Sequence, residues 1–124
     1  MSNITLYAQD LLARALCGRA PAMPTQVYLA LGTGGADATG VVGEPSGNGY
    51  ARQRVTFTGT GAQQNSTAVT FTFTAAAGTL SYAGLFDAAT GGNALTWSAL
   101  TQSVTITGAG TVTINPSGLN LQPN

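Results

Sequence analysis

Threonine alternates with large apolar residues along several segments of this chain, and this period of two restricts the fold more than any other feature. It is clearest over 69–74, which reads VTFTFT, and it returns over 104–107 and 111–114. Successive side chains of a strand point to opposite faces of a sheet, so each segment has one apolar face and one threonine face. Such strands are typical of antiparallel sheets that pack against each other.

The same pattern extends over most of the chain. We expect strands over 27–31, 50–58, 67–74, 79–86, 94–101, 103–107 and 110–115, with glycines 108 and 110 turning the last two into a hairpin. Short strands at roughly ten-residue spacing predict an all-β fold, an antiparallel β-sandwich of jelly-roll-like form. The side chains expected to face inward are Val27, Leu29, Leu31, Val55, Phe57, Val69, Phe71, Phe73, Leu85, Trp97, Val104, Ile106, Val112 and Ile114.

The first residues form a different pattern. Apolar side chains recur every three or four positions over 4–15, which predicts one short N-terminal amphipathic helix over 3–18, capped by Ser2 or Asn3 and ended by Gly18. Asp10 and Arg14 would pair on its polar side. We expect the apolar stripe to cover an edge of the domain's own sheet or to dock onto a neighbouring subunit. Cys17 is expected to be a small buried residue near the helix end.

The chain is expected to form a single domain over 1–124, with the helix at 3–18, the β-sandwich at 26–115 and an extended C-terminal tail at 116–124. The stretch from 32 to 49 reads as a long loop rich in glycine. In the tail, we expect Leu119 and Leu121 to insert into a groove on a neighbouring subunit or on the domain's own edge.

Composition excludes most chemistry. The chain has no histidine and no lysine, four arginines, four acidic residues and one cysteine. Side chains with a pKa near neutrality carry out most acid–base catalysis and bind most metals, so we expect no enzymatic activity, no cofactor and no metal. A net charge of zero, without a basic patch or a long apolar span, argues against nucleic-acid and membrane partners. We expect no small-molecule substrate either.

Three local patterns resemble chemical sites and have simpler explanations. The glycine-rich segments 32–35 and 47–49 precede neither a Lys-Ser/Thr pair nor a helix, so they read as flexible turns and not as phosphate-binding loops. Asp37 and Glu44 would serve a hydrolase only if they converged in a cleft. With glycine and alanine around them, we expect two solvated loop charges.

The densest polar cluster is Tyr50, Arg52 and Arg54, which would share one face of the strand over 50–58. It is either a solvated sheet face or a surface that binds a partner, because tyrosine and arginine are enriched at binding hot spots. We therefore take Tyr50, Arg52, Arg54, Leu119 and Leu121 as the candidate partner interface.

Two longer motifs carry a resemblance to a known family. The first is EPSGNGYAR over 44–52, and the second is YAGLFDAATGGNAL over 82–95, in which Asp87 would bond backbone amides and Gly91 and Gly92 would supply positive φ. Together with the short helix and the strand after Met23-Pro24, this order resembles a family of small structural proteins of tailed bacteriophages. Its members are described as capsid cement or decoration proteins or as tail-fibre proteins.

The resemblance implies a virion structural protein assembled in the bacterial cytoplasm and present in repeated copies. A small, neutral, threonine-rich body suits packing on several sides, so we expect a capsid cement protein that bridges and stabilises major capsid protein subunits and contacts copies of itself. This reading places the chain on the capsid surface. The alternative is a tail-fibre or tail-tip component, in a trimeric or ring-like assembly with fewer copies.

Overall fold

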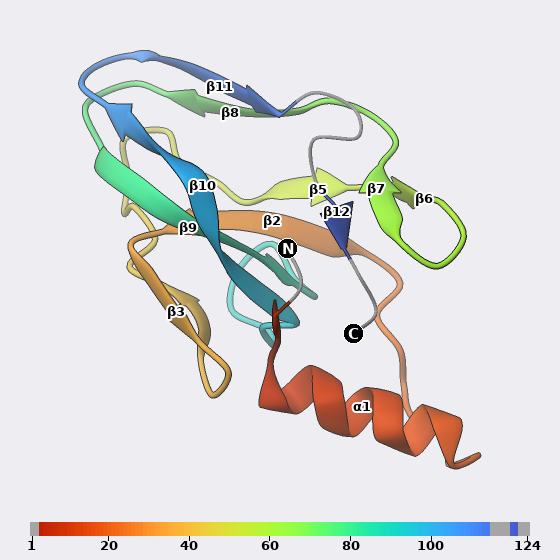
Figure 1. The fold of residues 1–124 in the computed structure, drawn as a ribbon. Helices are drawn as coiled ribbons and strands as arrows, with labels where there is room; N and C mark the ends of the chain where they lie inside the picture. Colours follow the sequence, from red (N-terminus) through yellow and green to blue (C-terminus); the bar gives the residue numbers. More distant parts are fainter. Residues whose placement is uncertain (1–2, 115–119, 122–124) are drawn as a thin grey trace.

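The computed structural model describes residues 3–114 and 120–121, in which antiparallel strands form sandwich-like layers beside one helix near the N-terminus (Figure 1). This confirms the all-β prediction. The elements are β1 (Asn3–Ile4), α1 (Leu6–Leu16), β2 (Val27–Gly32), β3 (Gly34–Ala36), β4 (Gly40–Val42), β5 (Gln53–Val55), β6 (Phe57–Thr58), β7 (Gln63–Asn65), β8 (Val69–Phe73), β9 (Gly78–Phe86), β10 (Thr96–Ile106), β11 (Gly110–Ile114) and β12 (Asn120–Leu121).

The main sheet has five strands in the order β1-β10-β9-β2-β5, and the two-stranded sheet β11-β8 lies over it (Figure 1). The alternation of β8 has the predicted effect, because Val69, Phe71 and Phe73 are buried while the threonines between them are exposed. These side chains pack against buried residues of the main sheet, including Leu29 and Leu85. Val27, Phe57, Val104, Val112 and Ile114, also expected inside, are partly buried against this core.

A second, smaller core lies on the other face of the main sheet. The segment 32–49, expected to be a loop, contains the hairpin β3–β4, in which Gly34 pairs with Val42 and Ala36 with Gly40. Ala30, Val41 and Phe86 are buried together there, and Trp97 packs against them instead of against the main core. A Cβ at Gly32 would collide with the carbonyl of Val42, so only glycine lets the hairpin approach this closely.

The predicted hairpin of the last two strands is wrong. The expected strands 94–101 and 103–107 are one strand, β10, which pairs with β9 and shifts register between Ala99 and Val104. After the turn that follows Ile106, β11 crosses to the other layer and pairs with β8, so that Val112 lies opposite Phe71. Ile106 stays buried in the main core while Val112 and Ile114 extend it, and this burial outweighs the local tendency to form a hairpin.

Helix α1 is shorter than the predicted 3–18, and its cap is Thr5. The Thr5 hydroxyl accepts a hydrogen bond from the amide of Ala8 at 3.2 Å and donates one to the carbonyl of Ala94 at 2.7 Å. Asn3 does not cap because Asn3–Ile4 forms β1, paired with Trp97 and Thr96 of β10. The expected pair between Asp10 and Arg14 is present at 3.0 Å.

The helix covers the domain with only part of its apolar stripe. Ala8 and Leu11 are buried, whereas Leu12 is 42% exposed and Leu16 is 88% exposed. Cys17 is exposed, so the expectation that it is buried is wrong. The physical reason is visible in Figure 1, where the C-terminal end of α1 extends away from the sheets.

Of the predicted tail, the structure describes only the short strand β12, which pairs antiparallel with β7 through Asn120–Gln64 and Leu121–Gln63. The backbone of Leu121 therefore lies on the edge of a sheet of its own chain. Leu119 lies outside the described residues.

Within the described part of the chain, α1 is too short to be a membrane-spanning helix.

The two faces of β8 give a matched test of the core. We expect Phe71→Ala to lower the free energy of unfolding by about 3–5 kcal/mol, because it leaves a cavity between the sheets. Thr72→Ala on the outer face should change it by less than about 0.5 kcal/mol. Urea unfolding followed by Trp97 fluorescence measures both values, and equal effects of the two substitutions would contradict the layered packing.

Candidate functional site

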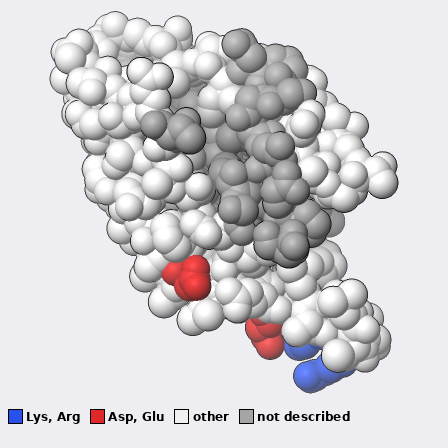
Figure 2. Space-filling model, viewed as in Figure 1, with Lys and Arg blue, Asp and Glu red and all other residues white. Residues whose placement is uncertain are grey.

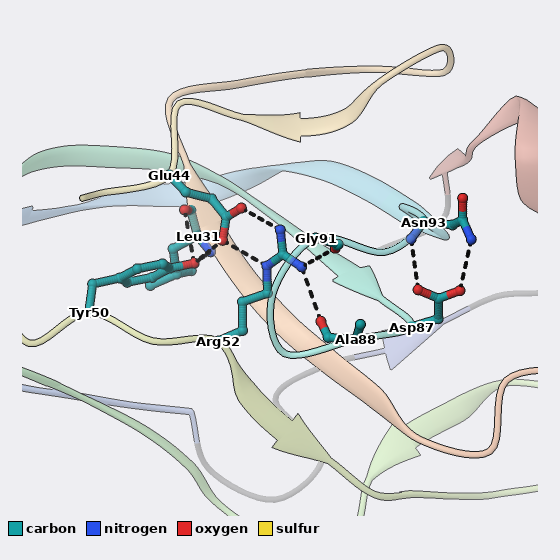
Figure 3. Close-up of polar contacts among 8 residues, drawn as sticks. All are labelled: Leu31, Glu44, Tyr50, Arg52, Asp87, Ala88, Gly91 and Asn93. Carbon is teal, nitrogen blue, oxygen red and sulfur yellow. Dashed lines mark hydrogen bonds and ion pairs between the residues drawn. The ribbon is translucent and has the colours of Figure 1, made fainter. Parts of the chain in front are cut away.

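Arg52 lies at the centre of the most highly connected polar group in the structure (Figure 3). Its Nη2 and Nε donate to the two carboxylate oxygens of Glu44 at 2.7 and 3.0 Å. This is a bidentate pair, the strongest geometry available to arginine and a carboxylate. The two side chains are 10% and 22% exposed, so water weakens their attraction much less than it would on an open surface.

Tyr50 connects this ion pair to the main core. Its hydroxyl donates to Glu44 Oε2 at 2.6 Å and accepts from the amide of Leu31 at 3.1 Å. Its ring stacks on Phe71 with centroids 6.0 Å apart, and it lies 6.2 Å from Phe73. The polar end of Tyr50 thus fixes the carboxylate, while its ring is part of the sandwich interior.

On its other side Arg52 binds the loop that follows β9. Its Nη1 donates to the carbonyls of Ala88 at 3.0 Å and Gly91 at 2.8 Å, and its guanidinium lies 3.7 Å from the centre of the Phe86 ring. The two motifs that resemble the phage family are therefore joined to each other through Arg52. We call Glu44, Tyr50 and Arg52, with these loop carbonyls, the Arg52 cluster.

The loop that Arg52 holds is also closed from within, as its sequence predicts. Asp87 accepts hydrogen bonds from the backbone amide of Asn93 at 2.7 Å and from its side-chain amide at 3.2 Å. Gly91 and Gly92 have φ of 62° and 72°, a region in which other residues are strained. These features fix the register with which the chain enters β10.

The cluster changes the pKa values of all three side chains. Burial raises the pKa of Glu44, but the hydrogen bonds from Arg52 and Tyr50 and the charge of Arg52 outweigh it and lower the pKa below 4.5. Burial and the hydrogen bond to Glu44 raise the pKa of Tyr50. The hydrogen bond to Glu44 raises the pKa of Arg52. All three therefore keep one protonation state across the neutral range.

The cluster has little capacity left to bind a ligand. Four of the five N–H groups of Arg52 are used, and so are both oxygens of Glu44 and the hydroxyl of Tyr50. A depression of about 300 Å³ lies beside it, walled also by Pro45, Ala51 and Thr90. The cluster therefore holds two loops together, the connection between β4 and β5 and the loop that follows β9.

The other predicted site residues are dispersed. Arg54 is exposed and lies opposite Tyr28 on the edge strand β5, away from the bonds that Arg52 makes. Asp37, expected to be solvated, is exposed, and it accepts a 2.7 Å hydrogen bond from the indole N–H of Trp97. Glu44 is not a solvated loop charge, because it is held in the Arg52 cluster. Asp37 and Glu44 share no partner, and no group of three or more acidic or cysteine side chains suited to a metal occurs in the described part of the chain.

Removal of the Arg52 side chain should strongly lower the stability of the fold. We expect Arg52→Ala to lower the free energy of unfolding by about 3 kcal/mol, because a partly buried carboxylate and two carbonyls lose the donors that Arg52 supplies. Arg52→Lys should recover little of this, since an ammonium group cannot form the bidentate pair and the ring contact together. Arg14→Ala removes the exposed helix pair, and we expect a loss of only about 0.5 kcal/mol. Thermal or urea unfolding of the three variants measures these differences, and equal losses would contradict a stabilising role of the partly buried Arg52 cluster.

The Glu44 pKa predicts how stability depends on pH. Because the pKa is lowered in the folded state, the stabilisation is complete above the ordinary value of 4.5 and is lost as pH falls through the folded pKa. We expect Glu44→Gln to be less stable than the natural chain at pH 7, with a difference that narrows between about pH 5 and pH 3. Urea unfolding across this range measures it. A difference that stays constant would show that Glu44 acts without its charge.

A comparison with protein families agrees with the motifs. The family model described as podophage GP4 fiber I protein gp80 matches residues 1–122 of the 124-residue chain. No curated protein matches the chain. The family match covers both motifs that meet at Arg52, and it makes the chain a structural protein of the tailed-phage virion. The chain belongs to the podophage GP4 fiber I protein gp80 family.

Proposed function

We propose that the chain is a structural subunit of a podophage tail fibre and has no enzymatic activity. The observation that carries this proposal is the match of a fiber I family to residues 1–122. The resemblance to a phage family, together with the composition, led us to expect a capsid cement protein first and a tail-fibre component second. The family description favours the second of these.

The structure supports a role in packing. Two charged pairs, Asp10–Arg14 and Glu44–Arg52, are satisfied within the chain. The outer face of β8 and β11 carries exposed, uncharged threonines, among them Thr70 and Thr113. Figure 2 shows that charged side chains cover little of the face in view and gather mainly towards α1. A neutral surface of this kind packs against other subunits without the cost of burying unpaired charge.

The Arg52 cluster supports the same role. A fibre subunit has to keep its shape when load is applied. A loop that is held by a partly buried arginine and a closed hydrogen-bond network resists local opening. Glu44, a carboxylate that a hydrolase would need, is fully occupied by Arg52 and Tyr50. This occupancy favours a structural use of the site over a catalytic one.

Purified virions provide the test. Quantitative mass spectrometry should find this chain in on the order of tens of copies per particle, as expected for a component that follows the symmetry of one tail. Antibody labelling should place it at the tail by electron microscopy. Labelling over the whole head, with copies in proportion to the major capsid protein, would reject the fibre in favour of the cement protein.

A further inference from the structure

Most of the eight charged side chains are bonded within the chain, but Arg19, Arg54 and one oxygen of Asp37 have no bonding partner among the described residues. Asp10 pairs with Arg14, and Glu44 with Arg52. Both oxygens of Asp87 are bonded by Asn93. Asp37 uses only one oxygen, which accepts from Trp97, and its second oxygen has no partner among the described residues.

One unpaired arginine lies in a groove. Arg54 makes no hydrogen bond or ion pair with any described residue. It lines a depression of about 350 Å³ together with the apolar residues Pro24, Val27, Val55 and Phe57 and the polar residues Thr25, Gln26 and Thr56. The other unpaired arginine, Arg19, is exposed and follows the exposed end of α1. A groove with apolar and uncharged polar walls and one free guanidinium fits a small protruding segment that carries one carboxylate.

The chain itself carries such a segment. Asp37 lies in the turn between β3 and β4, where residues 36–39 are all exposed and the only charge is its carboxylate. The indole of Trp97 holds one oxygen of this carboxylate, so its position is fixed before any partner arrives. The hairpin β3–β4 and the strands β5 and β6 lie on opposite sides of the molecule (Figure 1), so a single copy does not join them.

We propose that the Asp37 turn of one copy docks into the Arg54 groove of a second copy of this chain. The free oxygen of Asp37 accepts from the Arg54 guanidinium, and the small residues of the turn cover the apolar walls. Because the two surfaces differ and face apart, the contact is head-to-tail, and repetition closes a ring or extends a filament. The contact rests on the proposed function, since a fibre subunit works in several copies.

Sedimentation of the purified natural chain tests this contact. We expect self-association at low salt that weakens as salt is raised, because the ion pair is screened. Arg54→Asp and Asp37→Asn should each weaken association by about tenfold or more. Asp37→Asn keeps an oxygen that accepts from Trp97, so the turn is preserved. Arg19→Asp is the matched control and should associate like the natural chain.

Mixing the two single variants gives a stricter test. The Arg54→Asp chain still has its Asp37 turn, and the Asp37→Asn chain still has its Arg54 groove. At a concentration at which the natural chain associates and each variant alone is monomeric, the mixture should form pairs and nothing larger. Only a head-to-tail contact between these two surfaces gives this result.

Several outcomes overturn the proposal. These are a natural chain that stays monomeric at low salt, variants that associate normally, and a mixture that does not pair. If the chain's own C-terminal segment fills the groove, Arg54→Asp lowers the unfolding temperature and leaves association unchanged, which also overturns it. Thermal unfolding of each variant verifies folding. None of these outcomes affects the location of the chain in the virion, which copy number and labelling test separately.

Discussion

The fold depends on the sharing of one guanidinium group between a carboxylate and a loop. Arg52 neutralises Glu44, lies against Phe86 of the smaller core, and holds the carbonyls of Ala88 and Gly91. Through Tyr50 the same carboxylate is fixed to the aromatic side chains of the main core. A single, partly buried charge pair thus connects the two cores and the turn that leads into β10. The pair is stable only when all of its hydrogen-bond partners are in place, and this favours one arrangement of the loops that carry them.

The sequence was sufficient to predict the layers and most of the main core. Strict alternation made β8 and β11 easy to assign, because each had one apolar and one threonine face. The partner of β11 was not predictable in the same way. A local turn after Ile106 favours a hairpin, and only the burial of Val112 against Phe71 in the other layer decides against it. The hairpin β3–β4 was missed because its strands are rich in glycine. Apolar and polar residues do not alternate in them, and most of their positions carry no β-branched residue.

The candidate site was predicted in part. Tyr50, Arg52 and the turn around Asp87 were identified from the sequence, and the role of the turn was correct. The partner of Arg52 was missed, although a signal existed. Residues 47–49 form a turn with positive φ at all three positions, and Glu44 and Arg52 lie at equal distances on either side of Asn48. A chain reversal centred there brings these two side chains face to face. The bond from Asp37 to Trp97 spans 60 positions, and no local pattern predicts it.

The pairing of β1 with β10 has a consequence for the order of events during synthesis. Asn3 and Ile4 find their partners at Trp97 and Thr96, and the threonine that begins α1 donates to the carbonyl of Ala94. The start of the chain therefore stays without its final contacts until residues 94–97 have left the ribosome. Closing a loop of this length is slow, and folds dominated by such distant pairs form slowly. The domain should therefore complete its folding late, and until then its unpaired strand edges are exposed to other chains.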